Sequence, residues 1–391
     1  MWKTYKLSDI GTVVGGATPS TTVERFYGGD IPWLTPKDLS NFQDRYIERG
    51  ERNITQEGLN SCSAHLLPEN SVLFSSRAPI GYVAIAKNPI ATNQGFKSII
   101  PNANVDSLFL YYALKYNKEK IEAMGSGTTF KEVSGAIMKN FEISLPPLEE
   151  QRRIAGILGA IDDKIENNRR INTNLELQAQ ALYKQWFVDN RKDDWEEKQL
   201  GEIALHITDG VHNTVIDSPN GEYYLLSCKN IKSGQLFIGS NERRIDHETF
   251  TKLRKRTRLS HGDILVTSVG TVGEMYLVNE SPSNYEFQRS VAIIKPNNDI
   301  ISSYFLYAAL LYQQNEIKHL AHGAVQQCIF ISDMKEYSLI VPNKDDISAF
   351  DAVVAPMFNK IGELQKENET LAILRDTLLP KLMNGEIKVA E

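Results

Sequence analysis

A dense cluster of cations marks the second half of the chain. Seven Lys and Arg residues lie between positions 243 and 258, a span of sixteen residues that contains the acids Asp246 and Glu248. Such an excess of positive charge is typical of a surface that binds a polyanion, because each cation placed on a phosphate releases a counterion. A solvated helix face would mix the two signs more evenly. The sequence therefore predicts nucleic-acid contact at Arg243, Arg244, Lys252, Arg254, Arg256 and Arg258.

Amide and basic residues at comparable places in the two halves form a second group. The segment 93–97 aligns with the segment 286–290, and glycine-containing loops follow helical runs near residues 125–131 and 323–327. Amide and guanidinium groups can make paired hydrogen bonds to adenine and guanine in the major groove. One exposed Lys, Gln or Thr means little, so it is the paired placement that points to nucleic acid. The residues predicted to contact it are Lys37, Arg77, Asn93, Gln94, Lys97, Thr128, Thr129, Lys131, Lys229, Gln288, Arg289, Gln326 and Gln327.

The sequence carries no recognisable catalytic motif. It has no phosphate-binding loop with its lysine, no H-E-x-x-H and no Asn-Pro-Pro-aromatic segment of an amino-methyltransferase. The carboxylate pairs 162–163 and 345–346 are better interpreted as helix faces than as acid–base dyads. His319 and His322 are better interpreted as a surface pair than as zinc ligands. We predict no catalytic residue, no metal site and no cofactor in this chain.

Length and composition indicate a soluble chain of several domains. The chain has 391 residues, 41% of them hydrophobic and 24% charged, with a net charge of −6. This length predicts two to three domains. No apolar stretch approaches the roughly 20 residues of a membrane span, and the first residues lack a signal-peptide core. The three widely spaced cysteines are typical of a reducing compartment. We therefore expect a cytoplasmic protein without membrane contact.

The sequence contains a large internal duplication. Four blocks recur in order: the opening Trp-x4-Leu at an offset of 193, Val72–Ser76 at 192, and the blocks beginning at Ser107 and Phe141 at 196. One such match would be unremarkable, but four in order indicate a repeat with a period near 195.

Each repeat ends in a long helical segment with an apolar seam. The seam residues follow a 4-3-4-3 spacing, which is typical of a coiled coil. Asn172 and Asn368 occupy equivalent seam positions, where buried Asn would fix register. We expect Pro356 to kink or restart the second helix. The predicted seam consists of Ile154, Leu158, Ile161, Ile165, Asn172, Leu175 and Leu182 in one helix, and of Phe350, Val354, Ile361, Leu364, Asn368, Leu371 and Leu378 in the other.

These features predict an α+β fold with an internal pseudo-twofold repeat. Two similar mixed α/β domains are separated by two long antiparallel helices that form a coiled-coil spacer. An open alternative is that each apolar stripe docks on its own domain. Strands are predicted at 71–75, 81–86, 264–267 and 290–295, and helices at 105–123 and 302–320. The predicted division is 1–147 and 192–342 for the domains, and 148–191 and 343–391 for the spacer helices.

The chain resembles the specificity subunit of type I restriction–modification systems over essentially its whole length. The residues that carry the resemblance are 15–20 (GGATPS), 143–152 (ISLPPLEEQR), 180–189 (QALYKQWFVD) and 374–387 (LRDTLLPKLMNGEI). The second half lacks a counterpart of GGATPS and has Asp209-Gly210-Val211-His212-Asn213 instead. Base contacts therefore cannot be transferred from one half to the other.

The resemblance implies that each domain is a target-recognition domain for one half of a split double-stranded DNA sequence. It further implies that the helices set the gap between the halves and dock two copies of a modification subunit, with a restriction subunit in the full complex. S-adenosylmethionine, ATP and Mg would belong to those partners. The alternative is a coiled-coil structural adaptor that joins two protein-binding modules without DNA recognition.

Overall fold

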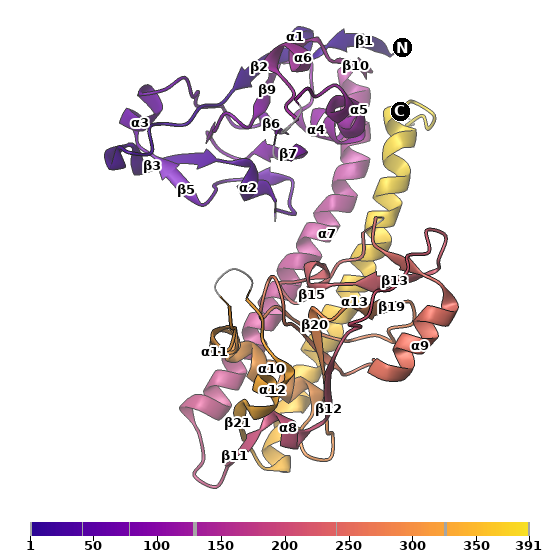
Figure 1. The fold of residues 1–391 in the computed structure, drawn as a ribbon. Coiled ribbons are helices and arrows are strands. Elements are labelled where there is room, and N and C mark those ends of the chain that lie inside the picture. The colour runs from indigo at the N-terminus through magenta and orange to yellow at the C-terminus, as the bar shows by residue number, and fades with distance from the viewer. Residues whose placement is uncertain are drawn as a thin grey trace. The chain divides into compact units, whose positions relative to one another are not determined.

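The chain divides into two compact units (Figure 1). The computed structural model describes residues 2–40, 42–77, 79–127, 131–239, 241–323 and 327–389. Unit 1 contains residues 1–167 and 368–391, and unit 2 contains residues 168–367. Each unit therefore combines one globular domain with one end of each long helix, α7 (Leu148–Tyr183) and α13 (Lys344–Met383). In the described part of the chain, no helix is long and apolar enough to cross a membrane.

Unit 1 is a mixed α/β domain with a five-stranded sheet of order β2-β9-β6-β7-β4 and a three-stranded sheet of order β5-β3-β8. Strand β1 pairs antiparallel with β10. Its strands are β1 (Lys3–Lys6), β2 (Gly11–Gly15), β3 (Tyr27–Leu34), β4 (Tyr46–Ile47), β5 (Arg52–Ile54), β6 (Val72–Ser76), β7 (Ile80–Ala86), β8 (Ala91–Thr92), β9 (Lys97–Pro101) and β10 (Glu142–Leu145). Its short helices are α1 (Leu7–Ile10), the 3₁₀ turn η1 (Glu24–Phe26), α2 (Pro36–Leu39), α3 (Gln56–Asn60), α4 (Ser107–Tyr116), α5 (Lys118–Ala123) and α6 (Gly135–Asn140).

Unit 2 has a four-stranded sheet of order β12-β20-β17-β18, a three-stranded sheet of order β16-β13-β19 and two strand pairs, β11-β21 and β14-β15. Its strands are β11 (Glu196–Gln199), β12 (Ala204–Asp209), β13 (Tyr223–Leu226), β14 (Ile231–Lys232), β15 (Gln235–Leu236), β16 (Arg244–Ile245), β17 (Ile264–Thr267), β18 (Met275–Leu277), β19 (Tyr285–Phe287), β20 (Val291–Pro296) and β21 (Ser338–Val341). Its other elements are the π-helical turn η2 (Lys184–Asp189), α8 (Leu200–Ile203), the 3₁₀ turn η3 (Cys228–Asn230), α9 (His247–Thr257), α10 (Ser303–Tyr312), α11 (Gln314–His319) and α12 (Ile331–Glu336).

The two sets of strands repeat the same topology. The order β12-β20-β17-β18 matches β2-β9-β6-β7, and β16-β13-β19 matches β5-β3-β8. The parallel pair β3–β8 recurs as the parallel pair β13–β19. The structure therefore confirms the predicted internal repeat. It also confirms the predicted strands at β6, β7, β17 and β20, while each predicted domain helix is divided in two, α4 with α5 and α10 with α11.

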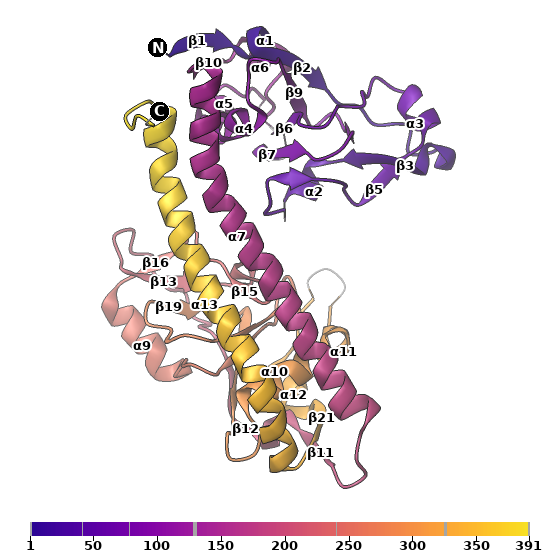
Figure 2. The same ribbon diagram turned by 180° about the vertical axis from the view of Figure 1, so that it is seen from behind.

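Within each unit, segments of α7 and α13 lie side by side (Figure 2). In unit 1, Asp162 of α7 pairs with Arg375 of α13, and Ile154 shares a core cluster with Leu382. In unit 2, the ring of Tyr183 at the end of α7 contacts Phe350, near the start of α13. Residue numbers rise along one helix as they fall along the other, so the helices are antiparallel, as predicted. Pro356 does not end α13, which is helical from residue 344 to 383.

The apolar stripes of the long helices also belong to the domain cores. Phe350, Val354 and Ile361 cluster with Phe305 of α10, and Ile154 clusters with Phe109 of α4. The same side chains therefore serve both in helix pairing and in docking on the adjoining domain. The sequence left open whether the stripes form a coiled coil or dock on their own domains, and they do both. The other predicted seam residues are buried (Leu158, Ile165, Leu364) or half-buried (Ile161, Leu175, Leu182, Leu371, Leu378).

The seam asparagines differ in their surroundings. Asn172 is only 2% exposed, and neither polar atom of its side chain has a hydrogen-bond partner within the described residues. Asn368 is half-buried. One turn before Asn172, Asn168 donates to Glu367 Oε2 over 2.8 Å. A buried amide without partners destabilises a fold by about 1–3 kcal/mol. Asn172 therefore lowers the stability of the seam.

Buried ion pairs fasten the domain of unit 1 to α7. The Arg45 side chain, 3% exposed, donates from Nε to Glu166 Oε1 over 2.9 Å and also pairs with Asp163. Asp162 accepts from Tyr112 Oη at 2.6 Å and from Arg375 Nη1 at 2.7 Å. Asp162 thus lies on a face of α7 that is covered by partners from α4 and α13.

Arg45 is expected to contribute strongly to stability. Arg45→Ala should leave Glu166, which is 15% exposed, without its cation, and breaking a buried pair costs about 3–5 kcal/mol. Chemical denaturation measures this loss. The control is Lys87→Ala, which removes the exposed pair with Glu48 and should change stability far less. Equal, small losses in both variants would contradict a structural role for Arg45.

Candidate nucleic-acid interface

Two backbone segments meet closely at one edge of unit 2. Val211 N donates to Phe287 O over 2.9 Å, and Arg289 N donates back to Val211 O over 3.0 Å. Gly210 directly precedes Val211, and a Cβ added to this glycine would overlap the carbonyl oxygens of Phe287 and Gln288. We call this meeting of segments 209–212 and 287–290 the junction of unit 2. Its close backbone approach requires glycine at position 210.

Unit 1 contains the same junction. Ala17 N donates to Thr92 O over 3.0 Å, and a Cβ on Gly16 would overlap the carbonyls of Thr92 and Asn93. The GGATPS segment thus has a structural counterpart around Gly210 although its sequence is not repeated. The junction of unit 1 consists of segments 16–18 and 92–95.

Matching hydrogen bonds define which residues of the two junctions correspond. Phe96 N donates to Asn93 O at 3.2 Å, and Val291 N donates to Gln288 O at 3.1 Å. Ser76 N likewise donates to Gly95 O, and Ser268 N to Ser290 O. Asn93 therefore corresponds to Gln288, and Gln94 to Arg289. The sequence alignment of 93–97 with 286–290 was wrong by two residues, because the segments share a backbone path but no side-chain pattern.

We name residues 93–95 and 288–290 the reading loops of units 1 and 2. Gln94 and Arg289 are exposed, while Asn93 and Gln288 are half-buried. Asn93 Oδ1 accepts from Gly95 N at 2.8 Å, and Gln94 contacts Thr18. In unit 2, the Arg289 and Gln288 side chains form no hydrogen bond or ion pair with any described residue. Both loops thus present amide or guanidinium groups on a fixed backbone.

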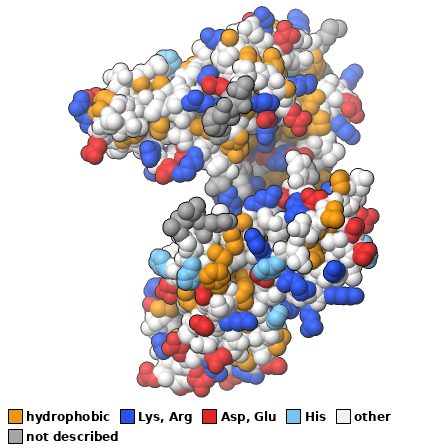
Figure 3. Space-filling model, viewed as in Figure 1, with side chains coloured by type: hydrophobic (Ala, Val, Ile, Leu, Met, Phe, Trp, Pro, Cys, Tyr) orange, Lys and Arg blue, Asp and Glu red, His pale blue; other side chains and the backbone are white. Residues whose placement is uncertain are grey.

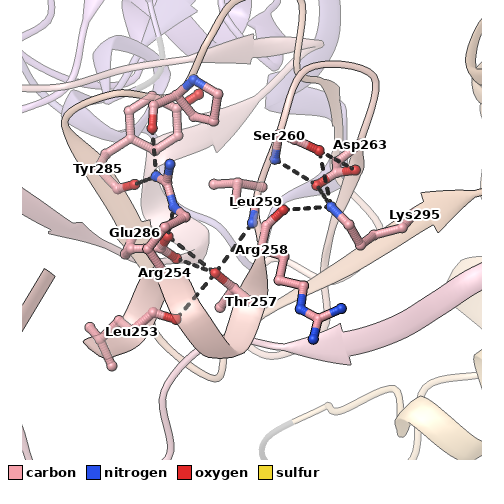
Figure 4. A network of polar contacts seen from close by, with 11 residues as sticks. Leu253, Arg254, Thr257, Arg258, Leu259, Ser260, Asp263, Tyr285, Glu286 and Lys295 are labelled. Carbon is pink, nitrogen blue, oxygen red and sulfur yellow. Dashed lines mark hydrogen bonds and ion pairs between the residues drawn. The ribbon is translucent and has the colours of Figure 1, made fainter. Parts of the chain in front are cut away.

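Three arginines of the cation cluster have acidic partners elsewhere in the chain. Arg254 pairs with the fully buried Glu286, as Figure 4 shows. Arg243 Nε donates to Asp217 at 2.7 Å, and Arg256 Nη1 lies 3.9 Å from Asp209 Oδ1. None of these three cations is paired with Asp246 or Glu248, the two acids within the cluster. Their carboxylates are between 26 and 47 residues away in sequence, so local composition could not reveal them.

Of the remaining cations of the cluster, three are exposed to solvent and one packs on an aromatic ring. Phe250 and Leu253 bury one face of α9, and Lys252, Lys255 and Arg258 are exposed. Figure 3 shows Lys and Arg side chains gathered over this part of unit 2, and the Arg258 guanidinium points away from the network in Figure 4. Arg244 instead stacks on Tyr224, with its guanidinium carbon 4.8 Å from the ring centroid.

Local structure explains why α9 begins where it does. Asp246 is the N-cap and accepts from Thr249 N at 2.8 Å. This bond to the carboxylate holds the pKa of Asp246 below its usual value. Asp246 therefore stays ionised and caps the helix from outside its exposed face of cations.

The other predicted contact residues lie at several places in the two units. Arg77 and Lys97 flank Glu132 at 3.7 and 3.5 Å, Lys37 pairs with Glu51, and Lys229 pairs with Glu242. Lys131 and Gln327 are exposed. Thr128, Thr129 and Gln326 lie outside the described residues. The described part of the chain holds no cluster of His, Cys, Asp or Glu suited to a metal ion.

Sequence reasoning missed His212 as a candidate contact. Its Nε2 lies 2.6 Å from Asp209 Oδ2, and its side chain is 57% exposed at the junction of unit 2. A possible signal was its place in the segment that replaces GGATPS. With Arg289 and Gln288, it gives this junction three side chains able to form hydrogen bonds with a ligand.

The chain is thus a duplicated α/β protein with one such junction in each unit. The family model of the type I restriction modification DNA specificity domain matches residues 1–177 and 192–369. The chain belongs to this family. It is therefore the non-catalytic subunit that recognises the DNA target in a type I restriction–modification system.

Known type I specificity subunits are similar to this chain, one of them along its whole length. It is 37% identical over 411 residues to the type I restriction enzyme MjaIX specificity subunit of Methanocaldococcus jannaschii, covering 100% of this chain and 94% of that protein. It is 32% identical over 168 residues to the EcoR124I/EcoR124II specificity subunit of Escherichia coli, covering 41% and 40%. The crystal structure of the S subunit from Mycoplasma genitalium has the same fold, with a TM-score of 0.55, 19% identity and coverage of 98% and 96%.

The exposed cations of α9 are expected to contact DNA phosphates. Replacing Lys252, Lys255 and Arg258 together by Ala should weaken DNA binding by the assembled complex. The negative slope of log affinity against log salt should become shallower by up to about 3, since each phosphate contact contributes about 0.9 to its magnitude. Affinity measured over a salt series tests this. Lys198→Ala on β11 should leave the slope unchanged. A parental slope in the triple variant would contradict phosphate contact at α9.

Proposed function

We propose that the chain recognises a split double-stranded DNA target, with one half-site for each domain. The observation that carries this proposal is the repeated junction. Both junctions share the same backbone hydrogen bonds and a close-approach glycine, Gly16 or Gly210. They differ in what they expose, Gln94 in unit 1 and Arg289 in unit 2. A repeated scaffold with different reading groups suits two different half-sites on one DNA duplex.

The long helices would set the distance between the half-sites. Helix α7 has 36 residues and α13 has 40, and 36 helical residues span about 54 Å at 1.5 Å per residue. Residues 148–191 and 343–391 would then form a coiled-coil spacer, and residues 1–147 and 192–342 the two target-recognition domains. The participation of both helices in the domain cores supports this role, because neither domain can turn independently of its helix ends.

Exposed apolar residues on the helices support docking of two copies of one partner. Ile157 and Val353 are 38% and 40% exposed, and Leu177 and Ile373 are 58% and 69% exposed. Each pair is separated by 196 positions, the offset of the duplication. Unit 1 therefore carries Ile157 and Ile373, and unit 2 carries their equivalents Val353 and Leu177.

Equivalent apolar pairs fit two identical subunits, since each copy would present the same surface. We assign this surface to the modification subunit, with a restriction subunit joining the full complex. S-adenosylmethionine, ATP and Mg would act in those partners, and this chain would hold no cofactor.

The three cysteines, Cys62, Cys228 and Cys328, are free thiols, which supports a reducing, cytoplasmic environment for the complex. A structural adaptor without DNA recognition, the alternative raised by the sequence, does not fit a chain that belongs to the DNA specificity family.

The modified DNA of a host is expected to show the split target directly. The chain is expressed together with its modification subunit, and methylated positions are mapped by sequencing. The expected motif has two specified segments separated by a fixed number of unspecified base pairs. The chain without its partner should methylate nothing. A single uninterrupted motif would contradict the assignment of one half-site to each domain.

The seam asparagines are expected to hold the register of the helices. The double variant Asn172→Leu and Asn368→Leu should raise the melting temperature, because it replaces a buried amide that lacks partners. The same variant should tolerate more than one gap between the half-sites, since buried polar groups specify register. Sequencing of methylated DNA measures the gap, and Thr173→Leu at an exposed neighbouring position is the control. An unchanged gap in the double variant would count against the register role.

A further inference from the structure

The Arg254–Glu286 pair (Figure 4) joins α9 to β19, the strand that leads into the reading loop of unit 2. Glu286 belongs to β19 and is fully buried, and the loop begins two residues later at Gln288. Burial raises the pKa of Glu286, and the Arg254 guanidinium opposes that rise. A buried carboxylate needs such a cation, because an unpaired charge in this position strongly destabilises a fold.

Arg254 uses Nε and Nη2 of its guanidinium for bonds within the protein. Besides pairing with Glu286, its Nη2 donates to Tyr285 O over 2.9 Å and to Pro282 O. Thr257 Oγ1, one turn further along α9, donates to Glu286 Oε2 over 3.0 Å. The end of α9 is therefore attached to β19 at several atoms, and the Arg254 side chain is 25% exposed.

The same helix also holds the other segment of the junction. Arg256 Nη2 donates to Asp209 O over 2.7 Å and to Gly210 O. Arg254 thus holds residues 282–286, which lead into the reading loop, and Arg256 holds segment 209–212. Side chains two residues apart on one helix determine how the two segments of the junction meet.

The reading loop itself combines a fixed backbone with free side chains. Gln288 N donates to Leu226 O over 2.8 Å, and Arg289 N to Val211 O over 3.0 Å. The Arg289 guanidinium is exposed and makes no hydrogen bond within the described residues. A guanidinium in this state can form two parallel hydrogen bonds to O6 and N7 of guanine, and a neighbouring amide can pair with adenine.

We propose that Arg289, together with Gln288, determines the base sequence of the half-site read by unit 2, and that Arg254 is a positioning residue for this loop. The proposal rests on the proposed function, in which each domain reads one half-site. It separates α9 into two roles. The half-buried Arg254 and the exposed Arg256 hold the junction through bonds within the protein, and the exposed Lys252, Lys255 and Arg258 contact phosphates.

Sequencing of methylated DNA from the complex with the modification subunit tests the assignment of Arg289. Arg289→Ala should relax one position in a single half-site, with a loss of discrimination of roughly 5- to 150-fold, as for one bidentate contact. The other half-site and the gap should stay the same. Because Arg289 is exposed, the variant should fold, and a melting curve checks this. A motif unchanged at every position would overturn the assignment.

Two variants of α9 separate positioning from phosphate contact. Arg254→Lys keeps the charge but loses the hydrogen bonds to Tyr285 and Pro282. It should relax the half-site of unit 2 with an unchanged salt slope. Lys255→Ala is the matched control on the same helix and should lower the slope by about 0.9 with an unchanged motif. If Arg254→Lys preserved the parental motif, the positioning role would be wrong. Failure of the parental complex to modify any split target would instead contradict the proposed function itself.

Discussion

Both globular domains are built onto the helix pair through shared hydrophobic cores. In unit 2, Phe187 at the end of the first long helix lies with its ring centroid 4.9 Å from Phe305 of the domain and 5.1 Å from Phe350 of the second helix. In unit 1, the buried Arg45 and Tyr112 bind acids of α7, and Arg375 of α13 binds Asp162. A domain cannot move against its helix ends without exposing these groups. The attachment therefore fixes each domain on its own segments of the two helices.

The two junctions combine one repeated backbone arrangement with different exposed side chains. The glycine and the backbone hydrogen bonds are repeated, while the exposed side chains are not. The helices behind the two junctions also differ. Helix α3 follows β5 as α9 follows β16, but its sequence QEGLN contains no cation. In unit 1, Arg77 and Lys97 instead flank Glu132.

The sequence was sufficient for the architecture because the architecture is encoded in local patterns. Apolar spacing predicted the long helices, and the recurrence of four blocks predicted the two similar domains. The details of the interface depend on partners that are distant in sequence. Glu286 lies 32 residues from Arg254, and Asp162 lies 213 residues from Arg375. Neither ion pair can be predicted from the residues that neighbour its members in the sequence. The correspondence of Gln94 with Arg289 likewise became visible only through backbone hydrogen bonds, since the two loops share no side chain.

The most direct measurement is an exchange of reading groups between the two domains. One variant carries Arg289→Gln and a second carries Gln94→Arg, each assembled with the modification subunit and followed by sequencing of methylated DNA. The account predicts that each variant changes one half of the motif, that the two variants change different halves, and that the gap remains constant. Changes in the same half in both variants, or a change in neither, would contradict the claim that each domain reads its own half-site through its own loop.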